Sequence, residues 1–300
     1  MTAPSQIRSR ALPARDAQPR TSVPSGSRKP TLPSAGLPQW LITFLAGIPL
    51  VVVLGIVWNL ISNAMDTPFV PTLGTIGRRF FDDWFSGPAS QLFLSQKLLD
   101  NGGPTVARLL IGWTTGVAIG IIGGVVIARF AALRDMAMPL IRLGMSTPSP
   151  ALLPVAIAFF GLGTSMKVFF IAFGTIWPVL TNTIAGLANS DQYVLNSGRS
   201  LILGKWLYMT EVLIPQASPQ IMSGIRVGSN AAILLIAVAE LYASKSGIGF
   251  VIVETQRNFD LVGTWSGIYI LCLIGVLFNA LFAAFEHRLM RWHYRSRSIS

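Results

Sequence analysis

The stretch LVGTWSGIYILCLIGVLFNALFAAF, from Leu261 to Phe285, contains no Asp, Glu, Lys or Arg. A helix of about 20 apolar residues crosses the roughly 30 Å hydrocarbon layer of a bilayer, because each residue adds about 1.5 Å. Further uncharged stretches cover 30–65, 109–128, 143–166 and 168–190, and another, 218–239, is interrupted only by Arg226. These stretches are continuously apolar rather than alternating, which argues against the strands of a β-barrel.

The pattern therefore predicts an all-α integral membrane protein with six transmembrane helices. They are expected near 41–61, 104–128, 148–162, 167–188, 218–241 and 262–286. Hydrophobic residues make up 52% of the chain and charged residues only 12%, about half the usual globular share, which excludes most soluble enzymes. One cysteine and two histidines exclude a disulfide framework and a cysteine- or histidine-rich metal centre, so no metal site is expected.

Both ends of the chain lie outside the predicted membrane domain. Residues 1–39 contain six Arg or Lys residues against Asp16 alone, together with seven prolines and no aromatic residue. Such a segment buries too little apolar surface to offset its ordering entropy, so it is predicted to be a disordered, basic cytoplasmic tail. Attraction to anionic lipid and a solvated extension without a specific role are both compatible with it. Residues 296–300 form a short C-terminal tail.

The distribution of positive charge predicts that both termini are cytoplasmic. In that orientation the cytoplasmic segments hold fifteen Lys and Arg residues and the external segments only six. The external six are Arg78, Arg79, Lys97, Lys167, Lys245 and Arg257. Segment 62–103 is then a long external connection, in which Phe80–Phe85 is expected to form a short interfacial helix.

Glycines recur at every fourth position of the second predicted span, at Gly112, Gly116, Gly120 and Gly124. This spacing places small residues on one helix face and allows two helix backbones to approach closely in lipid. Packing within one chain and a seam between two subunits both fit the pattern.

Segment 189–217 is the longest cytoplasmic connection between predicted spans. Its pattern predicts a helix from Gln192 to Leu203, a break at Gly204 and a second helix from Lys205 to Leu213. The hairpin carries more apolar side chains than a solvated loop requires. It is expected either to dock against a partner in the cytoplasm or to pack on its own helix ends.

This segment resembles the cytoplasmic loop that marks the permease subunits of ABC importers. The family pattern runs Glu-Ala-Ala, then a glycine, then a closing Leu-Pro. Asn196-Ser197-Gly198 stands where Glu-Ala-Ala is usual, and Ile214-Pro215 matches the closing pair. The chain departs from the pattern at Asn196, which replaces the acidic residue, and at Ile202, which occupies the glycine position two residues before Gly204.

The resemblance extends over about residues 40–295. The matching stretches are Pro104–Trp113, Pro148–Pro154, Phe160–Gly163, Gly224–Arg226 and Ala239–Gly249. Within ABC permeases, the chain is most similar to the subfamily that imports nitrate, taurine, aliphatic sulfonates and related small, mainly anionic solutes.

The resemblance implies a type I ABC importer permease fold over 40–295, with a cytoplasmic coupling hairpin at about 190–217. It implies a non-catalytic, cofactor-free transport subunit that forms a homodimer with a second copy in the cytoplasmic membrane of a prokaryote. Two ATPase subunits, which bind ATP and Mg, and an extracytoplasmic solute-binding protein complete the expected assembly. Nucleic acid is not an expected partner. The sequence is consistent with ATP hydrolysis by a separate subunit, because it contains no G-x-x-x-x-G-K-[ST] phosphate loop.

The residues expected to couple the ATPase to the helices all lie in the hairpin or at its end. They are Asn196, Arg199, Ser200, Leu201, Leu203, Gly204, Lys205, Trp206 and Pro215. The candidates for the substrate path are polar residues of the spans: Ser146, Thr147, Asn182, Arg226, Asn230 and Glu240. Each of them is equally compatible with a structural role, such as a hydrogen bond to a neighbouring helix or, for Arg226, pairing or snorkelling to water.

An ion-coupled secondary transporter is the alternative class. Such transporters usually need ionisable residues near the middle of the membrane. Only Arg226 and Glu240 qualify here, and each lies near one end of the fifth predicted span.

Overall fold

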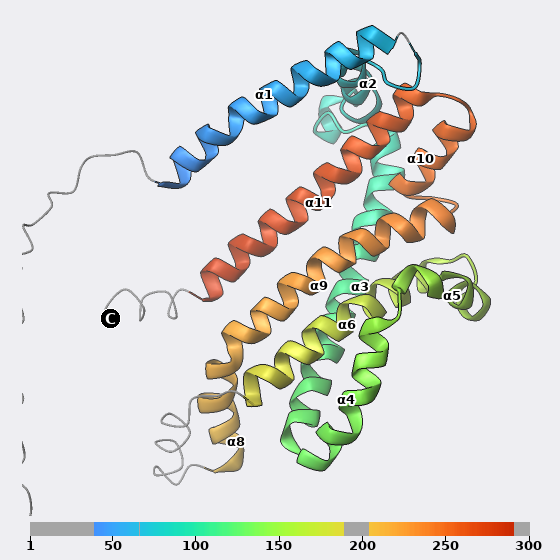
Figure 1. The fold of residues 1–300 in the computed structure, drawn as a ribbon. Helices are drawn as coiled ribbons and strands as arrows, with labels where there is room; N and C mark the ends of the chain where they lie inside the picture. Colours follow the sequence, from blue (N-terminus) through green and yellow to red (C-terminus); the bar gives the residue numbers. More distant parts are fainter. Residues whose placement is uncertain (1–38, 66, 189–203, 291–300) are drawn as a thin grey trace, which may run out of the picture. The chain divides into compact units, whose positions relative to one another are not determined.

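A computed structural model describes residues 39–65, 67–188 and 204–290, whose regular structure is entirely helical (Figure 1). The helices are α1 (Gln39–Met65), α2 (Leu73–Trp84), α3 (Gln96–Arg129), α4 (Ala131–Ser146), α5 (Leu153–Phe160), α6 (Thr164–Ala188), α8 (Lys205–Tyr208), α9 (Ile214–Tyr242), α10 (Ile248–Arg257) and α11 (Leu261–Leu289). Short 3₁₀ turns lie at Ala89–Gln91 and Ser149–Leu152, and a π-helical turn lies at Met209–Leu213.

The chain forms two units, Met1–Val53 and Leu54–Ser300. The described part of the first unit is the beginning of α1. The remainder of α1 and all later helices belong to the second unit, which contains every contact described below.

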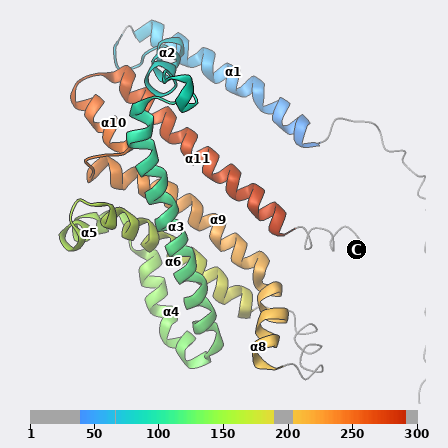
Figure 2. The ribbon, with the colours of Figure 1, turned by 180° about the vertical axis from the view of Figure 1, so that it is seen from behind.

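The centre of the second unit consists of α3, α6 and α9, which run side by side in both views (Figures 1 and 2). The glycine row of α3 is buried and faces α6 of the same chain. A Cβ atom at Gly116 would lie 2.7 Å from Thr175 Cβ, and one at Gly120 would lie 2.7 Å from Val179 Cβ. Any side chain in this row would push the two helices apart, so the row is a packing seam within one chain.

Buried hydroxyl groups in this centre are satisfied within their own helices. Thr175 and Thr183 of α6 and Ser229 of α9 each donate to the carbonyl oxygen four residues earlier, at 2.7–2.9 Å. Ser229 also accepts a hydrogen bond from Trp113 Nε1 at 3.0 Å, which links α9 to α3. In a bilayer, where little water is present, such internal pairing offsets the cost of burying a polar group.

A second layer joins α2, α10 and α11 to the end of α1. Trp84 of α2 is fully buried, and its Nε1 donates to Ser266 Oγ of α11 at 2.8 Å. Trp58 of α1 donates to Pro71 O at 3.0 Å and packs edge-on against Trp265, with ring centroids 5.0 Å apart. These contacts connect the segment between α1 and α2 to the start of α11.

Among the residues that the structure describes, five helices are long and apolar enough to span a membrane, and a bent pair brings the number to as many as six. The six-span expectation thus holds when the pair α4 and α5 counts as one span. The helix predicted over 148–162 is present as the 3₁₀ turn Ser149–Leu152 and α5, but it is only the second half of this pair and meets α4 at 90°. Pro148 and Pro150 occupy the break, and the first half, α4, is a segment that its charged residues had placed in the cytoplasmic connection.

Two helices begin earlier than expected. The interfacial helix predicted at Phe80–Phe85 is the end of α2, which starts at Leu73 behind the N-cap Thr72. The second span begins at Gln96 rather than at residue 104, because Ser95 Oγ caps it and Pro104 is accommodated within its first turns. Both differences arise from capping residues outside the uncharged stretches.

Candidate functional site

A buried ion pair joins α3 to α9. Arg108 Nη1 lies 2.9 Å from Glu240 Oε1, and the two side chains are only 7% and 0% exposed. The Thr105 hydroxyl lies one turn away on α3, at 2.8 Å from Glu240 Oε2. Charges this deep are stable only when paired and fully hydrogen-bonded, and here both conditions are met.

The same carboxylate holds the segment between α9 and α10. Gly249 N donates to Glu240 Oε2 at 3.1 Å, and Arg108 donates to the carbonyl and hydroxyl oxygens of Ser246 at 2.9 and 2.7 Å. Ile248 N donates to Thr105 Oγ1 at 3.0 Å. The start of α10 is therefore attached to α3 by side chains that also solvate the ion pair.

Two glycines make this close approach possible. Gly247 has φ +116°, and a Cβ atom there would lie 2.3 Å from Glu240 Oε1. At Gly249 a Cβ atom would lie 2.5 Å from Glu240 Cβ. Glycine is required at the first position by its backbone conformation and at both by the space that Glu240 fills.

A second cation is buried at the start of α6. Lys167 is 1% exposed, and its Nζ lies 3.5 Å from the carbonyl oxygens of Leu162 and Gly163. Thr164, in the same turn, accepts a hydrogen bond from Arg108 Nε at 3.3 Å. The start of α6 thus contacts the cluster around Glu240.

The other ion pair between spans joins α9 to α11 and is more open. Arg226 Nη2 lies 2.6 Å from Glu286 Oε2, and Arg226 Nε lies 3.2 Å from the same oxygen. The arginine side chain is 59% exposed and the glutamate 8%. Of the structural roles considered for Arg226, pairing with a carboxylate is the one observed.

The remaining path candidates bond to nearby groups. Ser146 and Thr147 donate to carbonyl oxygens of their own helix α4, each at 2.8 Å. Asn182 accepts from Gln220 of α9 at 2.8 Å, and Asn230 accepts from Asn279 of α11 at 3.2 Å. The structure does not bring the six candidates together in one site. Their role in a substrate path stays a prediction.

Most of the coupling hairpin lies outside the described residues. The coupling candidates that the structure does not describe are Asn196, Arg199, Ser200, Leu201 and Leu203. Its second helix starts at Lys205, directly after Gly204, as the sequence predicts. It does not end at Leu213. The helical backbone of α8 runs through the π-helical turn into α9, where Pro215 occupies the first turn. A π-helical turn inside a helix is rare and is frequently found at functional positions.

Sequence reasoning did not identify the partners of these groups. It missed Glu286 as the partner of Arg226, and it missed Thr105 and Ser246 beside Glu240. It also placed Lys167 in an external connection rather than in a buried turn. One signal in the sequence could have identified the glutamate partners. A charge next to an apolar span needs a counter-charge, and few acidic residues lie near the span ends.

Several long apolar helices, joined by ion pairs between spans, define a multi-pass membrane protein. Comparisons with known proteins narrow this class. Residues 116–291 match the family model described as the binding-protein-dependent transport system inner membrane component. The chain belongs to this family and is a permease subunit of an ABC importer.

Individual relatives agree with this family. The chain is 26% identical to SsuC of Bacillus subtilis (strain 168), named for aliphatic sulfonates transport, over 91% of this chain and 94% of that protein. It is 25% identical to the taurine transport permease TauC of Escherichia coli (strain K12), over 81% and 88% of the two chains. It is 30% identical to the nitrate import permease NrtB of Leptolyngbya laminosa, over 59% and 63%.

The fold has a counterpart among solved structures. A crystal structure of an amino acid ABC transporter with histidines superposes with a TM-score of 0.50 and 17% sequence identity. The match covers 71% of this chain and 94% of the other. This likeness supports the type I permease fold, and at this identity it concerns the fold alone.

Proposed function

We propose that this subunit carries a small anion of the sulfonate, taurine or nitrate class into the cell. The observation that carries the proposal is the family match over 116–291, together with relatives named for these solutes. A separate ATPase, which binds ATP and Mg, supplies the energy, because this sequence has no phosphate loop. This chain then performs no catalysis and needs no cofactor of its own.

The proposed assembly contains two copies of this chain, two ATPase subunits and an extracytoplasmic solute-binding protein. The family implies the ATPase and the binding protein, and the pairing of two copies is proposed from the resemblance of the sequence to importer permeases. The excess of Lys and Arg on one side of the spans supports cytoplasmic termini. In this orientation the α2 end of the helices faces outward and the α8 end faces the ATPase.

The continuous helical backbone from Lys205 to Tyr242 supports a coupling role for the hairpin. A displacement of the hairpin by the ATPase would act directly on α9, because no loop intervenes. Within this continuous helical segment, the π-helical turn at Met209–Leu213 departs from regular α-helical geometry. Rigid-body motion of helices around a fixed path is the usual logic of alternating access.

Uptake by the reconstituted complex tests the transport proposal. The permease is placed in proteoliposomes with its ATPase and binding protein, and radiolabelled taurine, an alkylsulfonate and nitrate are offered with and without internal ATP. ATP-dependent accumulation of at least one of these anions supports the proposal. Accumulation driven by an ion gradient without ATP, or of none of these anions when a different solute class is taken up, would contradict it.

Trp206→Ala tests the coupling step. A large aromatic residue at an interface commonly contributes about 2 kcal/mol or more on truncation, so the variant should bind the ATPase roughly 30-fold more weakly and lose transport. Membrane level and dimer content should stay unchanged. Leu201→Pro should uncouple transport more severely, because proline breaks a helix. Normal ATPase binding and transport by both variants would remove the hairpin from the mechanism.

A further inference from the structure

Lys167 is buried at the start of α6 without a carboxylate partner of its own in the part of the chain that the structure describes. Its Nζ lies 3.5 Å from two backbone carbonyl oxygens, which is long for a hydrogen bond, and the side-chain charges that act on it are those of Arg108 and Glu240. Glu240 already pairs with Arg108 at 2.9 Å. Two basic side chains therefore share one carboxylate. In a membrane protein, an ionisable residue at such a place commonly marks a path for ions or substrates.

Thr164 connects this basic cluster to the surface of α6. Its Oγ1 accepts a hydrogen bond from Arg108 Nε at 3.3 Å, so its own O–H group is free to donate. Within the described residues this hydroxyl donates to no acceptor, although Thr164 is exposed. Successive hydrogen bonds polarise one another, so a hydroxyl that accepts from a guanidinium is a stronger donor. The acceptor that best suits such a donor is an anion.

A groove of about 460 Å³ begins at Thr164 and runs between α3 and α6. Ser165 and Ile176, near its two ends, are separated by 11 positions of α6, so the groove is roughly 16 Å long. This size is within the range of sites that bind small molecules. Apolar and aromatic side chains form most of its walls, which consist of Ile111, Thr115 and Ile119 of α3 and Thr164, Ser165, Val168, Phe169, Ala172, Phe173 and Ile176 of α6.

Two more hydroxyl groups of this groove, those of Thr115 and Ser165, have no hydrogen-bond partner among the described residues. Other exposed hydroxyls of the spans bond to their own helix. Thr114, the neighbour of Thr115, donates to Leu110 O at 2.7 Å. A hydroxyl left unpaired in hydrocarbon is costly. The wall that carries Thr115 and Ser165 is therefore expected to face water or a polar ligand rather than lipid chains.

We propose that this groove is a section of the solute path and takes an alkanesulfonate, with the sulfonate at Thr164 and Ser165 and the alkyl chain along Phe169 and Phe173. This inference rests on the proposed transport of small anions and names one class among them. Charge complementarity locates the sulfonate, because the surplus basic side chain, Lys167, lies in the same turn of α6. The aromatic wall favours an alkyl chain, which nitrate lacks and which in taurine ends in an ammonium group.

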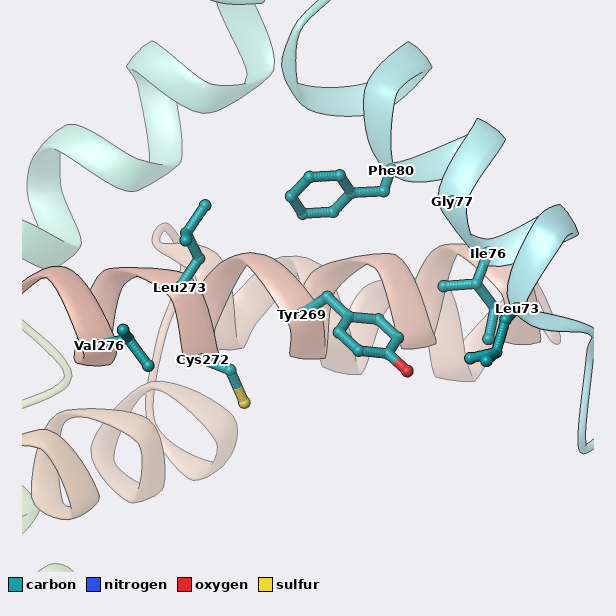
Figure 3. Close-up of a pocket in the computed structure, with 8 residues that line it drawn as sticks. All are labelled: Leu73, Ile76, Gly77, Phe80, Tyr269, Cys272, Leu273 and Val276. Carbon is teal, nitrogen blue, oxygen red and sulfur yellow. The ribbon is translucent and has the colours of Figure 1, made fainter. Parts of the chain in front are cut away.

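A second groove provides a comparison within the same chain. It lies between α2 and α11, has a volume of about 530 Å³, and the eight described residues that line it are all uncharged (Figure 3). Figure 3 shows apolar side chains such as Leu73 and Phe80 of α2 facing Leu273 of α11. Of the two grooves, the one at Thr164 is linked by a hydrogen bond to a buried basic side chain. An anionic probe should therefore distinguish the two grooves, whereas a neutral probe should not.

The experiment uses the complete permease–ATPase complex in nanodiscs and two probes that share a hexyl chain with a terminal diazirine. One probe is a sulfonate and the other a neutral methyl sulfone. After irradiation and digestion, labelled peptides are identified by mass spectrometry. We expect the sulfonate to label 168–176 roughly tenfold more than 269–276, the equivalent of one hydrogen bond to a charged group. The neutral probe should label the two segments alike, and excess hexanesulfonate should remove the preference of the anionic probe.

Thr115 and Thr114 provide a matched pair of substitutions, because both are exposed threonines of α3 and Thr115 is the one that lines the groove. Thr115→Phe should fill the groove and lower labelling of 168–176 by the sulfonate, whereas Thr114→Phe should leave it unchanged. Thr164→Val keeps the shape of the side chain and removes its hydroxyl. It should reduce this labelling roughly tenfold, because the donor to the sulfonate is lost.

Lys167→Met tests the contribution of charge. The variant should narrow the difference between the anionic and the neutral probe, whereas a damaged fold would lower labelling by both probes. Lys245→Met, which removes an exposed lysine, should leave the difference unchanged. Thr164→Val tests the same site without changing a buried residue, so the proposal stays open to refutation if Lys167→Met fails to fold.

Three results would overturn the proposal. The first is equal labelling of 168–176 and 269–276 by the sulfonate, which would indicate simple partition into apolar surfaces. The second is unchanged labelling in both Thr115→Phe and Thr164→Val. The third is a disulfide between two copies that carry Thr115→Cys in a Cys272→Ser background, because a second copy would then cover the groove. ATP-dependent uptake of taurine and nitrate is measured separately, so failure here leaves the importer assignment intact.

Discussion

The ion pairs Arg108–Glu240 and Arg226–Glu286 have the same chemistry but opposite surroundings. In the first, both side chains are nearly inaccessible and the carboxylate also binds Thr105 and the backbone of α10. In the second, the arginine side chain is 59% exposed. A buried pair is costly to break, because the group left behind keeps its charge without solvent, whereas an exposed pair contributes little.

The difference teaches what each pair does for the fold. The pair at Glu240 determines where α10 begins, since the glycines at 247 and 249 pack directly on this carboxylate. The pair at Glu286 joins two spans at a place where water or lipid headgroups can replace the partner of the arginine. Arg108 and Arg226 each have a glutamate partner, so the positive charge of each is locally neutralised.

Removal of Glu240 should have the largest effect. We expect Glu240→Ala to lower the free energy of unfolding by about 3–5 kcal/mol, because Arg108 stays buried without its counter-charge. This corresponds to a melting temperature lower by roughly 6–20 °C, measured on the detergent-solubilised full chain. The control is Glu254→Ala, which removes an exposed glutamate of α10. A similar, small shift in both variants would show that the buried pair does not differ from a surface charge.

The close approach around Glu240 gives the next largest effect. Gly249→Ala should cost about 1–3 kcal/mol, because the new Cβ atom would lie 2.5 Å from Glu240 Cβ and the backbone has no space to move. Gly103→Ala is the matched control. Nothing lies within 4 Å of a Cβ atom there, so alanine should raise stability by up to about 1 kcal/mol through helix propensity. If the two variants melt alike, the glycine at 249 is not required by packing.

Whether the sequence predicts a structural feature depends on how far apart in the chain the interacting residues lie. Uncharged length predicted five spans, since hydrophobic length is a local property. For the remaining span the sequence predicted only the second half, because α4 carries Arg134, Asp135 and Arg142 and was therefore assigned to the cytoplasmic connection. Pro148 and Pro150 mark the bend between the two halves, but the angle of 90° between them is not encoded in a local pattern.

The candidate site depends even more on contacts between distant residues. Arg108 and Glu240 are separated by 132 positions, and Arg226 and Glu286 by 60. The sequence left a substrate-path role and a structural role open for Glu240, and the hydrogen bond from Gly249 to its carboxylate shows a structural contact. The partners Thr105 and Ser246 are ordinary polar residues without a distinguishing pattern, so only the folded chain identifies them.

The second pair should respond unequally to loss of its two members. Arg226→Ala leaves Glu286, whose side chain is 8% exposed, without its cation. We expect a loss of about 1–2 kcal/mol, the cost of a charged group deprived of its main partner. Arg288→Ala, which removes an exposed arginine from the end of α11, should change the melting temperature little. Equal losses in the two variants would mean that Arg226 stabilises the helices only as one more surface charge.

The smallest effect is expected for Glu286→Ala. The guanidinium of Arg226 stays 59% exposed, so after loss of the carboxylate it can be solvated by water or snorkel to headgroups. The expected loss is below about 1 kcal/mol, the value typical of exposed pairs. The double variant Arg226→Ala, Glu286→Ala should be no less stable than Arg226→Ala alone, because removing the carboxylate also removes the uncompensated charge. A loss for Glu286→Ala as large as that for Glu240→Ala would show that the two pairs are equivalent despite their different exposure, and the comparison would fail.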